Sequence, residues 1–285
     1  MIDYLKNIYR MLTSWYILPV GLWTGSRREN KWLKKNRREQ DPNLNPYEQR
    51  WEHIKKKVKK STRRIGATIE LVNEENLPNG AAWITPNHTS NFDPFYLIKA
   101  MGGRINLIPI AKKKLEDSKL ASGYIRGADG FFIDRSKLRE QIVLLNGAAQ
   151  LAKNTNRAVT IFPEGTRSFT SELLSFKDGS FKFAQRYYLP IVPITITGTL
   201  QARPYFRLKT AHIKVIVHKP IKASEHMKLP TEIVSKRVFE TIQRELRNYE
   251  DGLSIKEKAK LEKLKIKARK LEVKKNIKLN KELGI

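Results

Sequence analysis

A histidine and an aspartate lie close together in a short polar segment, Asn87-His88-Thr89-Ser90-Asn91-Phe92-Asp93-Pro94. Imidazole can take up a proton near neutral pH, and a carboxylate that accepts one ring N–H leaves the other nitrogen free to do so. Because the segment consists of turn-forming residues after an apolar run, Asp93 is near enough in sequence to fold back on His88. The pattern predicts a general base with its orienting carboxylate. The alternative is a structural histidine.

A second segment, Phe162-Pro163-Glu164-Gly165-Thr166-Arg167-Ser168, also follows an apolar run. Its proline ends the preceding strand, and its glycine permits a sharp turn that can present Glu164 and Arg167 in one site. A guanidinium is suited to bidentate recognition of phosphate. The segment therefore indicates a clamp for an anionic group, and the alternative is an ordinary surface turn.

Two more cations follow apolar runs. Arg135 comes after Phe131-Phe132-Ile133-Asp134, where it could serve the same anion or pair with Asp134. Lys112 stands in Ala111-Lys112-Lys113-Lys114, where it could do similar work or belong to a solvated lysine run. Cations at several strand ends suggest one convergent anion site.

The elements that must position these residues are those of an α/β core, because apolar runs alternate with helical patterns from residue 65 to about 225. Asp93-Pro94 is typical of an N-cap followed by proline at the first helical position. His88 and Asp93 would then lie between a strand and a helix, where catalytic groups of α/β sheets are usually found. The predicted strands are 65–71, 81–85, 105–110, 131–133, 158–162, 191–197 and 213–217, and the predicted helices are 94–100, 138–152, 180–188 and 231–249.

Composition limits the classes of function. The formal net charge is +28 and the pI is about 10.2, which indicates an anionic partner: nucleic acid, an anionic lipid surface or a phosphorylated substrate. The chain has no cysteine, which excludes disulfides, a thiolate nucleophile and cysteine-ligated metal sites. Zinc-finger, KH, RNP and Walker A motifs are missing from the sequence and its basic residues concentrate in the flanks, so we favour a partner other than nucleic acid.

Three regions differ in composition: an N-terminal helical region 1–64, a core 65–250 and a basic helical tail 251–285. Met11 to Trp23 is apolar but too short to span a bilayer, and it contains Pro19. We therefore expect it to lie in the membrane interface, with Trp15, Tyr16 and Trp23 at headgroup level. The tail carries a partial apolar stripe, so it is either a solvated helix or a basic amphipathic helix for a membrane surface or an acidic partner.

The segments His88 to Asp93, Phe131 to Arg135, Phe162 to Arg167 and Ile191 to Ile194 resemble, in order and spacing, the four motifs of the glycerolipid acyltransferases. Within that family the bacterial 1-acyl-sn-glycerol-3-phosphate acyltransferases are the most similar group. The resemblance covers roughly residues 65 to 220, and it implies a mixed central sheet flanked by helices, with helical extensions at both ends. The sequence departs from the family pattern at Lys114, where an acidic residue is frequent, and in the basic tail.

The resemblance also implies roles. His88 would be the general base and Asp93 its partner, and Val192-Pro193 would form a wall near the acyl site. The acceptor and its phosphate would be bound by Lys112, Arg135, Glu164, Gly165, Thr166 and Arg167.

The implied reaction transfers a fatty acyl group from acyl-CoA or acyl-carrier protein to the sn-2 hydroxyl of 1-acyl-glycerol 3-phosphate (lysophosphatidic acid), giving phosphatidic acid in phospholipid biosynthesis. No metal or bound cofactor is implied. We expect the enzyme at the cytoplasmic face of the membrane, on an anionic surface. The alternatives are another lysophospholipid or glycerol 3-phosphate as acceptor, a basic nucleic-acid-binding protein, and a catalytically silent membrane scaffold.

Overall fold

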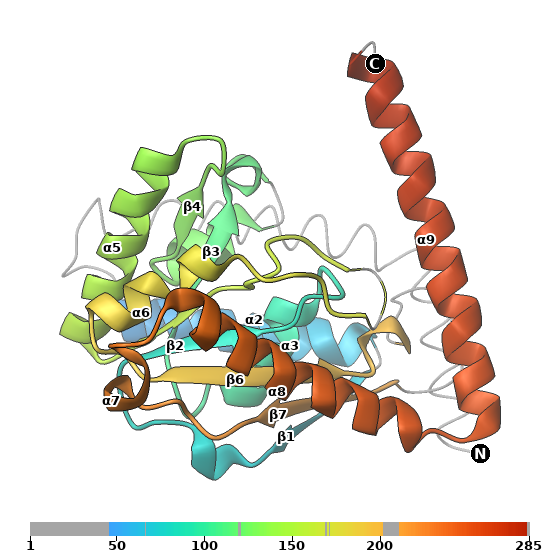
Figure 1. Cartoon of the computed structure of the whole chain (residues 1–285), viewed down its shortest axis with the longest axis horizontal. Coiled ribbons are helices and arrows are strands. Elements are labelled where there is room, and N and C mark those ends of the chain that lie inside the picture. Colours follow the sequence, from blue (N-terminus) through green and yellow to red (C-terminus); the bar gives the residue numbers. More distant parts are fainter. Residues whose placement is uncertain are drawn as a thin grey trace.

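The computed structural model describes residues 46–283, apart from 66, 119–120, 169, 171 and 202–210. These residues form a seven-stranded sheet in the order β1-β7-β6-β2-β5-β3-β4, covered by helices on both faces (Figure 1). The strands are β1 (Ala67–Val72), β2 (Ala82–Pro86), β3 (Leu107–Lys112), β4 (Phe131–Ile133), β5 (Ala158–Thr160), β6 (Ile191–Thr197) and β7 (Ala211–Val217).

The helices are α2 (Tyr47–Ile65), which precedes β1, and α3 (Asp93–Met101), α4 (Ser122–Gly127), α5 (Leu138–Thr155), α6 (Lys182–Arg186), α7 (Ala223–His226), α8 (Thr231–Asp251) and α9 (Ile255–Leu283). Short 3₁₀ turns are η1 (Glu74–Asn76), η2 (Lys113–Leu115), η3 (Asp178–Ser180) and η4 (Thr199–Gln201). Every predicted strand is present, with its ends displaced by no more than two residues. Helices α4 and α7 were not predicted, and α2 was predicted only as part of the helical N-terminal region.

All neighbouring strands are parallel except β6 and β7, which are antiparallel, so the sheet is mixed as expected. Its central strands are apolar on both faces. In β2, Trp83 is buried in the core that α5, α6 and α8 cover, while Ile84 is buried in the core beneath α2 and α3. A strand covered on both faces reads as a continuous apolar run, which is why β2 and β6 were recognisable in the sequence.

Helix α2 belongs to the packed core, although the division predicted at residue 64 places it in the membrane-binding region. Its Trp51, Ile54 and Val58 are buried against the sheet. Arg50 and Arg157 both pair with Asp129, at 2.7 and 3.0 Å, and so join the helix to the turn before β4. Lysines separate these apolar residues in the sequence, so the segment was predicted to be part of the basic N-terminal region.

The predicted interfacial segment Met11 to Trp23 lies outside the described residues, so it stays a prediction. The described residues contain no helix whose length and apolar composition would let it span a bilayer.

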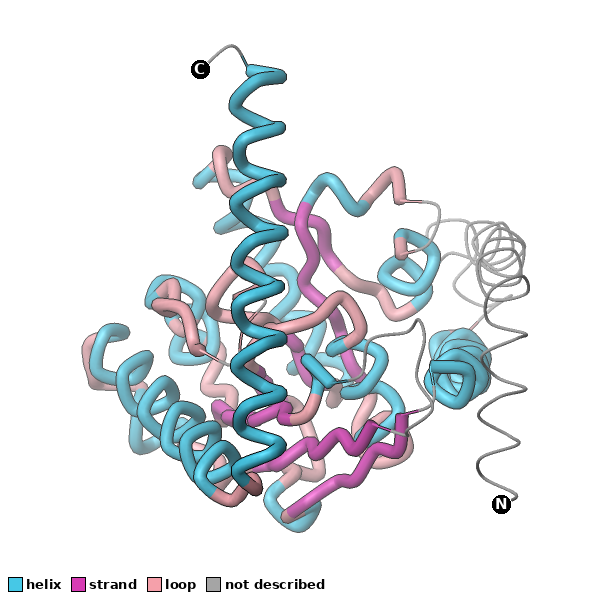
Figure 2. Tube along the Cα trace, turned by 90° about the vertical axis from the view of Figure 1, so that its right-hand side faces the viewer, coloured by secondary structure: helices cyan, strands magenta, loops and turns pink. Residues whose placement is uncertain are grey.

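Helix α9 extends from the end of α8 along one side of the molecule (Figures 1 and 2). Leu261 is buried, and so is Lys265, which pairs with Glu250 at the end of α8 (3.2 Å). The C-terminal extension is therefore helical, as predicted, and its first turns are anchored to the core.

Candidate active site

The candidate residues gather at one edge of the sheet because β2, β3, β4, β5 and β6 run in the same direction. Their carboxyl ends therefore meet there, which is the usual place for ligand sites in open α/β sheets. His88 follows β2, Arg135 follows β4, and the segment from Phe162 to Arg167 follows β5. Lys112 ends β3.

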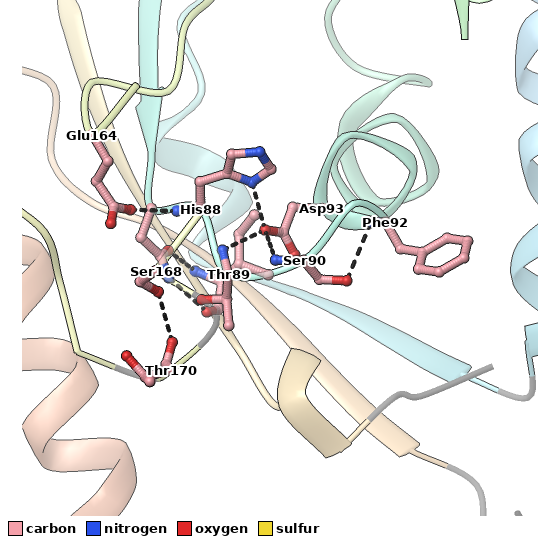
Figure 3. A network of polar contacts seen from close by, with 10 residues as sticks. His88, Thr89, Ser90, Phe92, Asp93, Glu164, Ser168 and Thr170 are labelled. Atoms are coloured by element: carbon pink, nitrogen blue, oxygen red, sulfur yellow. Dashed lines mark hydrogen bonds and ion pairs between the residues drawn. The ribbon is translucent and has the colours of Figure 1, made fainter. Parts of the chain in front are cut away.

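The side chains of His88 and Asp93 form the predicted dyad (Figure 3). Nδ1 of His88 lies 2.9 Å from Oδ2 of Asp93. Because the carboxylate oxygen can only accept, the ring N–H is at Nδ1, and Nε2 is the nitrogen that can take a proton. Asp93 is fully buried, whereas the His88 side chain keeps 18% of its surface exposed. A substrate hydroxyl can thus reach the base but not the carboxylate behind it.

Asp93 differs from the predicted N-cap. Helix α3 begins at Asp93 itself, and its N-cap residue is Phe92, which makes no capping hydrogen bond through its side chain. The Asp93 carboxylate turns back toward the preceding loop, where Oδ2 also accepts the backbone N–H groups of Thr89 and Ser90, both at 2.7 Å. A carboxylate that accepts three N–H groups cannot rotate freely, so it holds both the ring and the loop that carries it.

The loop from residue 87 to residue 93, here called the dyad loop, is also fixed from outside. Asn87 continues the pairing with β6 through its side chain: it accepts from the N–H of Ile196 (2.7 Å) and donates to the carbonyl of the same residue (3.1 Å). The backbone of His88 donates to Glu164 (2.6 Å) and accepts from the N–H of Ser168 (2.8 Å). Both backbone groups of the base are therefore held by neighbouring segments.

Glu164 has a different position from the one predicted for an acceptor-binding residue. Its side chain is buried, and its two oxygens accept backbone N–H groups, one from His88 and one from Leu174 (3.0 Å). Burial raises the pKa of the Glu164 carboxyl to about 7, against the two N–H groups, which lower it. With its oxygens occupied, Glu164 fastens the dyad loop to the segment after β5. We therefore assign it a positioning role in place of acceptor binding.

Phe162 also contacts the base, although no role was predicted for it. Its ring stacks on the His88 imidazole, with centroids 4.1 Å apart and an angle of 29° between the planes. Together with the Asp93 contact, this stacking fixes the plane of the imidazole. Asn87 and Phe162 are the first residues of the two segments that drew attention in the sequence, but neither side chain has a chemistry that singles it out.

The cation cluster, defined here as Lys112, Arg135 and Arg167, lies at the same edge. Nζ of Lys112 is 3.5 Å from Oγ1 of Thr166. Burial lowers the pKa of Lys112, and the nearby positive charges lower it further: Arg135, Lys114 and Arg167. Among the described residues, neither Lys112 nor Arg135 forms an ion pair with a carboxylate, and Asp134 accepts from Ser136 instead (2.7 Å). Several cations close enough to repel one another make a site that attracts an anion.

Gly165 permits the close approach of Arg135. Its φ of 71° is in the left-handed region, and a Cβ at this position would lie only 2.4 Å from the Arg135 guanidinium. The guanidinium therefore packs directly over the Gly165 backbone, which brings the end of β4 to the turn after β5. All the predicted site residues thus lie at one edge, with Glu164 beneath it. Within the described residues no histidine, aspartate and glutamate side chains gather as a metal site.

Comparisons with known proteins agree with this geometry. Residues 68–197 match the family model described as Acyltransferase. The chain is 33% identical over 196 residues to a probable 1-acyl-sn-glycerol-3-phosphate acyltransferase of Mycoplasma pneumoniae, covering 65% of this chain and 73% of that protein. It is 37% identical over 164 residues to the 1-acyl-sn-glycerol-3-phosphate acyltransferase of Saccharomyces cerevisiae, covering 55% of this chain and 52% of that one.

A solved structure shares the fold. The crystal structure of the 1-acyl-sn-glycerophosphate (LPA) acyltransferase PlsC from Thermotoga maritima superposes with a TM-score of 0.65, covering 88% of this chain and 99% of that one at 22% identity. The predicted mixed sheet flanked by helices is therefore confirmed.

Proposed function

The chain belongs to the acyltransferase family, and from this premise we propose that it transfers a fatty acyl group from a thioester to the sn-2 hydroxyl of 1-acyl-glycerol 3-phosphate, giving phosphatidic acid. The observation that carries the proposal is the buried Asp93 behind a partly exposed His88, with a cluster of mutually repelling cations at the same sheet edge. A general base beside an anion site fits an acceptor that is both an alcohol and a phosphate monoester. The names of the two sequence relatives point to the same acceptor.

In the proposed reaction, Nε2 of His88 takes the proton of the acceptor hydroxyl as its oxygen attacks the thioester carbonyl. The tetrahedral intermediate collapses with cleavage of the C–S bond, and the imidazolium returns the proton to the departing thiolate. Asp93 keeps the neutral tautomer with N–H at Nδ1 and stabilises the imidazolium while it exists. General-base catalysis of this kind is typically worth about 10²–10⁴-fold in rate.

The cation cluster places the acceptor. Arg135 and Arg167 are suited to bind phosphate oxygens, with Lys112 as an additional donor. Binding an anion there would relieve the mutual repulsion that lowers the pKa of Lys112. The same chemistry would admit glycerol 3-phosphate or another lysophospholipid, so these are the acceptors to compare with lysophosphatidic acid.

Two further parts belong to this proposal. The donor is acyl-CoA or acyl-carrier protein, both of which carry phosphate that a basic protein attracts. The enzyme works at the cytoplasmic surface of an anionic membrane, where its lipid acceptor is dissolved, with the segment Met11 to Trp23 inserted in the interface.

The test is an assay with the purified full chain, each donor in turn, and lysophosphatidic acid, lysophosphatidylcholine or glycerol 3-phosphate in detergent, with products identified by mass. We expect phosphatidic acid from lysophosphatidic acid, and at least about tenfold less product from lysophosphatidylcholine, whose phosphodiester carries less negative charge, since one charge-assisted contact is worth about 1.5–3 kcal/mol. A preference for lysophosphatidylcholine would refute the assignment of the cation cluster as a phosphate-monoester site. Absence of acyl transfer with every pair would refute the proposed function.

A further inference from the structure

Helix α9 lies against the same side of the molecule as the dyad loop. It contacts η4, which follows the carboxyl end of β6. A small pocket there is lined by residues of both regions, among them Thr89 of the dyad loop and Leu261 of α9. Figure 2 looks onto this side and shows α9 crossing it in front of the strands. The helix is therefore placed beside the catalytic edge.

One face of α9 is used to hold it there. Leu261 is buried, Lys265 pairs with Glu250 and Glu262, and Arg269 pairs with Glu172 in the segment after β5. Successive members of this set are four residues apart, so they fall along one side of the helix. These contacts tie α9 both to α8 and to the polypeptide that follows the anion-binding turn.

The other side of α9 faces solvent and has a distinct composition. Lys256, Lys260, Lys263, Lys267 and Lys270 are exposed, and their spacing alternates between four and three residues, which places them along one stripe. A second stripe borders it and carries exposed apolar side chains, with Glu262 among them: Ile255, Ile266 and Val273 are 90%, 49% and 56% exposed. Over its whole length the helix has twelve lysine and arginine residues against four glutamates.

Exposed apolar side chains beside a stripe of lysines are typical of a helix that lies in the interface of an anionic membrane. The apolar side chains enter the boundary between headgroups and acyl chains, and the lysines reach anionic headgroups while their stems cover apolar surface. An acidic protein partner would use the lysines but would leave isoleucine and valine side chains exposed along the contact. The combination of both stripes therefore favours a lipid surface.

We propose that the outward face of α9 docks the enzyme on an anionic lipid bilayer and so holds its catalytic edge at the membrane. The proposal rests on the function proposed above, because a lipid acceptor must pass from the bilayer to His88. It assigns a second membrane contact besides the predicted N-terminal segment, and this contact is joined through Arg269 and Glu172 to the segment that follows the anion-binding turn.

The test compares two full-length variants that lose the same positive charge. In the first, Lys260, Lys263, Lys267 and Lys270 are replaced by glutamine, which leaves Leu261, Lys265 and Arg269 in place. In the matched control, glutamine replaces four exposed lysines on or next to α5, α6 and α7, at the far end of the molecule from α9 in Figure 1: Lys153, Lys182, Lys222 and Lys228. Co-sedimentation is measured with vesicles of phosphatidylcholine alone and with phosphatidylglycerol added.

We expect the α9 variant to bind the anionic vesicles at least about tenfold more weakly than the wild type, since each lysine near such a surface contributes on the order of a several-fold gain in binding. The control should bind nearly as well as the wild type. Ile266→Gln should weaken binding in a way that high salt does not reproduce, because apolar insertion is not screened. Acyl transfer to detergent-dispersed lysophosphatidic acid should be unchanged in all variants.

Equal vesicle binding by the α9 variant and the wild type would overturn the proposal, and so would an equal loss in both lysine variants, which would show that net charge alone matters. If the α9 variant bound vesicles normally but had a raised KM for acyl-carrier protein, α9 would be a binding site for the protein donor, and the proposal would also be overturned. These results are separate from a failure of the proposed function, which would appear as absence of product with the wild type in detergent.

Discussion

The dyad loop and the cation cluster lie at the same edge of the sheet but are built in opposite ways. The dyad loop is held by many hydrogen bonds, most of them to buried groups: Asn87 to Ile196, Glu164 to His88, and Asp93 to three N–H groups. The cation cluster consists of half-buried and exposed cations that repel one another. The general base must be in the right place before the substrate arrives, whereas the cations need the substrate to complete their contacts.

The largest effect should come from the base itself. His88→Ala should lower kcat by about 10²–10⁴-fold while thermal unfolding stays close to that of the wild type, because Asp93 keeps the backbone N–H groups of Thr89 and Ser90. A suitable control is His212→Ala, which removes an exposed histidine from β7 and should leave turnover unchanged. Near-normal turnover of the His88 variant would show that His88 is not the general base.

Removing a cation should act on the acceptor and not on the geometry of the dyad. Arg135→Ala should raise the KM for lysophosphatidic acid by about 10- to 150-fold, equivalent to roughly 1.5–3 kcal/mol for a charge-assisted contact, with a smaller change in kcat. Added salt should produce the same trend in the wild type. Arg139→Ala, an exposed arginine at the start of α5, is the matched control. An unchanged KM would move the phosphate site away from the cation cluster.

Loosening the dyad loop should lower kcat and stability and leave the KM for the acceptor nearly unchanged, the opposite of removing a cation. Asn87→Ala removes two hydrogen bonds to Ile196 and leaves the buried N–H and carbonyl of that residue unpaired. We expect a loss of about 1–3 kcal/mol in the free energy of unfolding, and a fall in kcat with the acceptor KM nearly unchanged. Asn91→Ala, at an exposed position in the same loop, should change neither quantity. A raised KM with normal stability would contradict the positioning role.

The smallest predicted effect is a pH dependence of stability. Burial raises the pKa of Glu164 to about 7, above its value in the unfolded chain, so the folded state holds a proton that the unfolded chain releases. This contribution is fully present below about pH 4.3 and is lost as the pH rises through 7. Between pH 6 and pH 8 the wild type should lose roughly 1 kcal/mol relative to Glu164→Gln, measured by denaturant unfolding at both pH values. If the free energy of unfolding changed equally with pH in the wild type and in Glu164→Gln, Glu164 would not be the titrating group.

The sequence was most informative where the signal is local. A strand covered on both faces must be apolar along its whole length, so β2 and β6 could be located without the structure. In β1 and β7 more exposed residues alternate with more buried ones, and this period of two is also visible in the sequence. His88 and Asp93 are close in sequence, and their pairing follows from chemistry once a turn lies between them. Helix α2 was not assigned to the core because its apolar face is interrupted by lysines that point to solvent, and only its contacts with the sheet show that it is a core element.

Glu164 and Asn87 show the limit of that approach. A glutamate beside an arginine in a turn reads as a substrate contact, and an asparagine in a loop reads as a turn former. Both are in fact buried against segments far away in the sequence, Glu164 on the backbone of His88 and Asn87 on that of Ile196. The spacing of residues along the chain does not predict which buried backbone group will form a hydrogen bond with a given polar side chain.

The sequence alone thus determined the α/β fold class, the order of the strands along the chain, the dyad and the set of cations around it, because these depend on periodicity and on residues close together in the chain. The tertiary structure decided how they are combined. Parallel pairing brought the ends of β2, β3, β4 and β5 to one edge, the left-handed turn at Gly165 admitted Arg135, and packing at that edge turned one face of α9 inward and left the other to solvent. These arrangements depend on contacts between residues distant in sequence, whose partners are fixed only when the sheet has formed.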